Sequence, residues 1–168
     1  DPADGPGAFI PPATGLPERD VGLEATSPVT VQGTQDQFIC VVFDPALLED
    51  RYLSGMNIVP GNALVAHHAL LMRADRDEVA SLSGGSDQFP CFGGPPGELI
   101  HAWAPGGQPL ELPSDIGIAI QSDQVVVVQM HYHPTGTSVE LDQPTVELRF
   151  HEQKPTWSFN VALPGNAS

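Results

Sequence analysis

Basic residues are scarce in this sequence, with 6 lysines and arginines against 21 aspartates and glutamates, so the formal net charge is −15. A field of this sign repels nucleic-acid phosphates and anionic lipid headgroups, and neither is expected as a partner. Long apolar runs are also missing: none approaches the ~20 residues of a transmembrane helix, so no membrane insertion is expected. No glycine-rich phosphate loop joins a strand to a helix, which argues against a nucleotide cofactor.

Cysteine is the next scarcity, because the chain has only Cys40 and Cys91. Both lie beside apolar, strand-like residues. One interpretation is a disulfide, which implies an oxidising compartment; the other is a pair of buried free thiols. The chain starts at Asp1 without an initiator Met or a signal peptide, and we interpret it as a mature or trimmed product.

Glycine (17) and proline (18) are abundant and punctuate short apolar runs, as in turn-rich β domains. Residues 1–25 are rich in Pro, Gly, Ala and Asp and are predicted to be a flexible tail or linker, leaving 26–168 as one domain. A short helix is predicted over Pro45–Leu53, after Asp44 as its cap, and a short turn over Asp75–Ser81.

Crossover helices are missing between the apolar runs, so we predict an all-β, antiparallel β-sandwich, jelly-roll-like, of about eight to nine strands. The predicted strands are Val29–Gln32, Gln37–Phe43, Leu64–Met72, Leu99–Trp103, Ile116–Ile120, Gln124–His133, Thr145–His151 and Ser158–Leu163.

Two histidine clusters carry the chemistry. His67 and His68 are adjacent within an apolar strand, where successive side chains point to opposite faces. They can share one metal only if the backbone bends, as at a bulge or a strand end. The alternative is one core histidine with a hydrogen bond and one surface histidine. His131 and His133 share one strand face by alternation, and their alternative is a solvated strand end.

Together the two clusters favour a metal site, and imidazole donors without thiolate suit copper, zinc or iron equally well. His101 lies in a third strand, next to apolar residues, and we interpret it as structural or as a neighbour of the metal. His151 ends a strand and is predicted to be solvent-exposed.

An ordered set of motifs over about residues 26–160 resembles the N-terminal domain of the copper type II, ascorbate-dependent monooxygenases, the family of peptidylglycine α-hydroxylating monooxygenase and dopamine β-monooxygenase. The matching pieces are Gln37–Cys40, His67–Leu71, Phe89–Cys91, Ala102–Ala104, Leu112-Pro113, Gly117 and Val128–Tyr132.

The resemblance implies that His67, His68 and His131 hold one electron-transfer copper. It also implies a Cys40–Cys91 disulfide, an ascorbate-type reductant and a secreted, periplasmic or extracellular location. His133 is not a ligand in the family pattern and is expected near the copper without binding it.

The chain departs from the family in three ways. Members carry further disulfides, and animal members have another residue in place of His101, which suggests a bacterial-type relative. The family's catalytic copper lies on a second domain, which these residues do not include. The expected function is therefore the electron-transfer domain of a monooxygenase that hydroxylates a C–H bond with O₂, inactive alone and partnered by a second copper domain or chain. The alternatives are a stand-alone copper carrier or sensor, and a structural or adhesive sandwich.

Overall fold

The computed structural model describes residues 15–158, in which the chain forms thirteen strands and one helix. The strands are β1 (Val21–Glu24), β2 (Val29–Val31), β3 (Gln37–Phe43), β4 (Arg51–Val59), β5 (Ala66–Asp75), β6 (Gln88–Pro90), β7 (Glu98–Trp103), β8 (Leu110–Glu111), β9 (Ile116–Ile120), β10 (Gln124–Tyr132), β11 (Glu140–Asp142), β12 (Thr145–Phe150) and β13 (Trp157–Ser158), and the helix is α1 (Arg76–Ser83).

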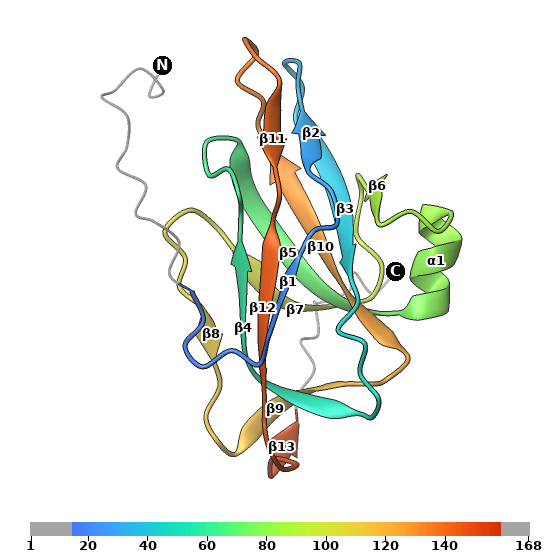
Figure 1. The fold of residues 1–168 in the computed structure, drawn as a ribbon, viewed down its shortest axis with the longest axis vertical. Coiled ribbons are helices and arrows are strands. Elements are labelled where there is room, and N and C mark those ends of the chain that lie inside the picture. Colours follow the sequence, from blue (N-terminus) through green and yellow to red (C-terminus); the bar gives the residue numbers. More distant parts are fainter. Residues whose placement is uncertain (1–14, 159–168) are drawn as a thin grey trace, which may run out of the picture.

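The strands form a sandwich of two main sheets (Figure 1). One sheet has the order β1-β12-β4-β9-β13, with β8 paired to β4, and the other has the order β6-β3-β10-β5-β7. β2 and β11 make a separate two-stranded ribbon. Within residues 15–158, every pairing is antiparallel except the short β13–β9 pair. The predicted fold class is confirmed, although the strand count exceeds eight to nine because several strands have only two or three residues.

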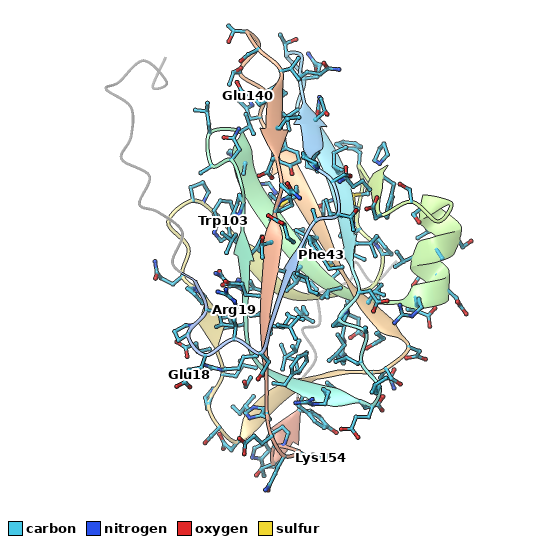
Figure 2. All side chains as sticks on the ribbon, viewed as in Figure 1. Glu18, Arg19, Phe43, Trp103, Glu140 and Lys154 are labelled. Atoms are coloured by element: carbon cyan, nitrogen blue, oxygen red, sulfur yellow. A yellow bond between two sulfur atoms is a disulfide. The ribbon has the colours of Figure 1, made fainter. Side chains whose placement is uncertain are left out.

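The main core lies between the two sheets, and β10 shows why. Its residues Val126, Val128, Met130 and Tyr132 alternate along the strand and are fully buried in this core, as period-two packing requires. Phe43 and Trp103, both labelled in Figure 2, belong to the same core at the ends of β3 and β7.

A smaller core covers the outer face of the β6-β3-β10-β5-β7 sheet. It contains Val125 and Val127 of β10, Val79 of α1 and the disulfide between Cys40 and Cys91. The disulfide is therefore present, and of the two interpretations of the cysteines the free thiols are wrong.

The helix lies where the sequence predicted only a short turn, over Asp75–Ser81. The Asp75 carboxylate caps it by accepting hydrogen bonds from the backbone N–H groups of Asp77 and Glu78, and Gly84 ends it in the left-handed conformation. Within the described residues, no helix is long and apolar enough to cross a membrane.

The predicted helix over Pro45–Leu53 is wrong. Asp44 does accept a hydrogen bond from the backbone N–H of Ala46, as a cap would. However, Ala46 has a φ of 50°, in the left-handed region, so no α-helix starts there. Asp44 also forms an ion pair with Arg76 of α1.

Strand β4 replaces the end of that helix, and the sequence did not predict it. Residues 53–58 are buried without a break, and Gly55 together with a register shift against β12 interrupts the alternation of apolar and polar residues along the strand. Its buried polar groups find partners on β12: Arg149 donates to Ser54, and Asn57 donates to Glu147.

Both ends of the described segment differ from the expected limits. Val21–Glu24, assigned to the tail by sequence, pairs with β12 along its whole length. Of the predicted strand Ser158–Leu163, only Ser158 belongs to the described residues, as the last residue of β13. The rest of that prediction lies outside them.

Candidate metal centre

The two histidine clusters meet on neighbouring strands of one sheet. β5 and β10 pair residue by residue, from Asp75 opposite Gln124 to His68 opposite His131. The next pair on the ladder places Tyr132 opposite Ala66. His67 is therefore an extra residue, the β-bulge of this ladder. The bulge is the local bend that two adjacent histidines need in order to face one point. Ala66 and Ala69, on either side of the pair, both face the main core.

The three side chains converge through their Nδ1 atoms. The Nδ1 of His68 lies 3.1 Å from the Nδ1 of His67 and 3.2 Å from the Nδ1 of His131. One ring nitrogen from each of the three histidines lies within 4.8 Å of the other two. Two nitrogens bound to one tetrahedral ion at 2.0–2.1 Å stand about 3.3 Å apart, so both distances to Nδ1 of His68 match those expected around a bound ion.

Hydrogen bonding alone does not satisfy this cluster. The Nδ1 of His68 faces two other ring nitrogens, but a neutral imidazole nitrogen either carries one hydrogen or offers one lone pair. The nitrogen cannot donate to His131 with its hydrogen and also accept from His67. A cation that accepts three lone pairs removes this conflict, so the donor set fits a metal ion bound by imidazoles.

Asp36 supports the cluster from the loop before β3. Its Oδ2 lies 3.0 Å from Nε2 of His131, and its Oδ1 lies 2.8 Å from Nδ1 of His133. These two hydrogen bonds hold the pKa of the Asp36 carboxyl below its usual value. The sequence analysis missed Asp36, because an aspartate in a loop carries no pattern that links it to a distant histidine.

Exposure changes sharply across the three histidines. His131 is 9% exposed, and its ring stacks on Phe38 with centroids 4.2 Å apart and planes 9° from parallel. His67 is exposed to solvent, and His68 is half-buried. Burial, followed by the neighbouring His131 and His67 rings, lowers the pKa of His68, so its ring favours the uncharged form that binds metals.

The other histidines lie outside the cluster. His133 turns its ring toward Asp36 and remains 72% exposed at its side chain. His101 pairs with Leu71, which faces the main core, and the ring of His101 is half-buried. His151, predicted to be exposed, is half-buried, and its Nε2 lies 2.8 Å from the carbonyl oxygen of Ile116.

The ring nitrogen Nε2 of His101 is buried and has no hydrogen-bond partner among residues 15–158. The same burial lowers the pKa of the His101 ring.

No known protein-family model matches the sequence. The geometry of the site and the motifs quoted above are therefore the basis for assigning a function.

Proposed function

We propose that the chain is a copper-binding electron-transfer domain related to the ascorbate-dependent copper monooxygenases. The observation that carries the proposal is the convergence of one ring nitrogen from each of His67, His68 and His131, with Nδ1 of His68 close to Nδ1 of both other rings, beside the bulge of β5. The choice of copper over zinc or iron comes from the family resemblance, since the three donors are compatible with each of these metals.

The donor set suits a redox metal. Bound copper would supply a one-electron couple, taking an electron from a reductant and giving it to an acceptor. Three neutral imidazoles bind both Cu(I) and Cu(II) without imposing a strict geometry. The chain holds His131 on the inner side, where Phe38 covers it, and leaves His67 exposed, so small reductants and an acceptor can reach the His67 edge.

The reaction as a whole needs a second site in this proposal. O₂ activation and C–H hydroxylation take place at another copper, on a second domain or a partner chain, and an ascorbate-type molecule is the reductant. The Cys40–Cys91 disulfide is compatible with an oxidising compartment, and we propose an extracellular or periplasmic location.

The test is copper binding by the wild type and by His67→Ala, His68→Ala and His131→Ala. The wild type is expected to bind one equivalent of Cu(II), to be reduced by ascorbate and to be reoxidised by an added acceptor. Each alanine variant loses one of three donors and is expected to bind at least about tenfold more weakly. His151→Ala is the control, because its ring bonds to Ile116 and lies outside the cluster.

Three other outcomes have a clear meaning. Absence of stoichiometric copper in the wild type contradicts the metal site. Copper that binds but does not cycle between oxidation states supports the carrier or sensor instead. Hydroxylation of a substrate by these 168 residues alone contradicts the need for a second copper domain.

A further inference from the structure

We propose that Asp36 is the positioning residue of the metal centre: its carboxylate holds His131 with the proton on Nε2, so that Nδ1 faces the ion, and His133 holds the carboxylate. This inference concerns how the chain presents a ligand, and it rests on the proposed function only for the identity of the metal.

The proton position follows from the hydrogen-bond partners. An ionised carboxylate only accepts hydrogen bonds, so Nε2 of His131, 3.0 Å from Oδ2 of Asp36, must carry a hydrogen. A neutral imidazole has one N–H, and Nδ1 of His131 is then left with its lone pair. That lone pair points at the cluster, 3.2 Å from Nδ1 of His68. A carboxylate behind a histidine ligand fixes its orientation and raises its basicity.

The strand register brings these groups together. His131 pairs with Phe38 across β10 and β3, and Asp36 precedes Phe38 by two residues, so it reaches the end of β10 where His131 and His133 lie. The stack of Phe38 on His131 limits ring rotation from one side, and the Asp36 bond limits it from the edge.

His133 has a separate part in this arrangement. Its Nδ1 lies 2.8 Å from Oδ1, the oxygen that His131 does not use, so each carboxylate oxygen receives one ring N–H. Asp36 is half-exposed, at 45% of its side chain, and a single bond would leave it free to rotate. The two histidines of the His-x-His pair thus differ: His131 faces the ion, and His133 orients the group behind His131.

The first experiment uses metal-free protein, so it does not depend on copper. Ring ¹⁵N and ¹H NMR of the wild type should show His131 protonated at Nε2, with an N–H proton protected from solvent exchange. Asp36→Ala should lose that protected proton. Asp36→Asn should keep it, because the amide oxygen still accepts from His131 and the amide nitrogen can donate to Nδ1 of His133.

The second experiment compares Cu(II) and Cu(I) affinities by chelator competition. Asp36→Ala should weaken Cu(II) binding by ~10–100-fold. Asp36→Asn should weaken Cu(II) binding more than Cu(I) binding, because the lost negative charge stabilises the more highly charged ion. Asp44→Ala is the matched control: Asp44 follows β3 at its other end, pairs with Arg76 and should leave both affinities unchanged.

Two results overturn the proposal: a protected Nε2 proton that persists in Asp36→Ala, or Asp36→Asn with the Cu(II) and Cu(I) affinities of the wild type. Asp36→Asn keeps the side-chain volume, so it remains informative if the alanine variant does not fold. A wild type that binds no copper defeats the proposed function, while the NMR comparison still decides the role of Asp36.

Discussion

Removing the disulfide by Cys40→Ala/Cys91→Ala should cost a large part of the domain's stability. The bond joins residues 51 positions apart, and the chain-entropy relation for a loop of this length predicts a loss of about 4 kcal/mol in the free energy of unfolding. Small domains have about 5–15 kcal/mol in total, so the variant should fold but unfold at a much lower denaturant concentration.

Two other bonds should preserve the local structure beside the histidine cluster in that variant. The backbone N–H of Cys91 donates to the carbonyl of Phe38, and Nε2 of Gln129 donates to the carbonyl of Cys91. We therefore expect copper affinity to change little while stability falls.

Urea unfolding followed by circular dichroism measures the effect, with dithiothreitol as the control. Reductant should lower the wild-type midpoint toward that of the double variant and leave the double variant unchanged. A stability loss below about 1 kcal/mol would refute the reasoning that loop closure makes this bond a major stabilising element.

The remaining predictions concern two buried polar groups. Tyr132→Phe should lower the free energy of unfolding by about 2 kcal/mol, since the fully buried hydroxyl donates to the buried Asp142 carboxylate at 2.7 Å; urea unfolding measures this, and an unchanged midpoint contradicts it. Because burial lowers the pKa of His101 below the value of about 6.5 that it has when unfolded, the unfolded chain binds more protons, and stability falls as pH drops below about 6.5. In urea titrations, His101→Leu should lose less stability between pH 7 and pH 5 than the wild type. An equal loss in both proteins argues against His101 as a source of the pH dependence.

Sequence reasoning worked best where the period of two assigns residues to the faces of a strand. β10 is buried on both faces, and the alternation still predicted which of its residues, His131 among them, lie on each side. The need for a backbone bend at His67 and His68 also followed from period-two geometry, and the structure has a bulge there.

It failed where the pattern is set by neighbours. In β4, Gly55 and a register shift against β12 interrupt the alternation, so the sequence does not distinguish this strand from a loop or a buried helix. The helix expected at Pro45–Leu53 had a suitable cap and first residue, but Ala46 has a left-handed backbone and β4 begins at Arg51. α1, in contrast, had its cap in the sequence but was expected only as a short turn.

For the site, local sequence determined which side chains are available as ligands, because strand periodicity and apolar flanks follow from nearby residues. Tertiary structure decided how those side chains are used. Asp36 is 95 positions from His131, and only the β3–β10 register brings its carboxylate behind the His131 ring and within hydrogen-bond distance of His133. Strand pairing brings distant residues together through backbone hydrogen bonds that no local pattern specifies.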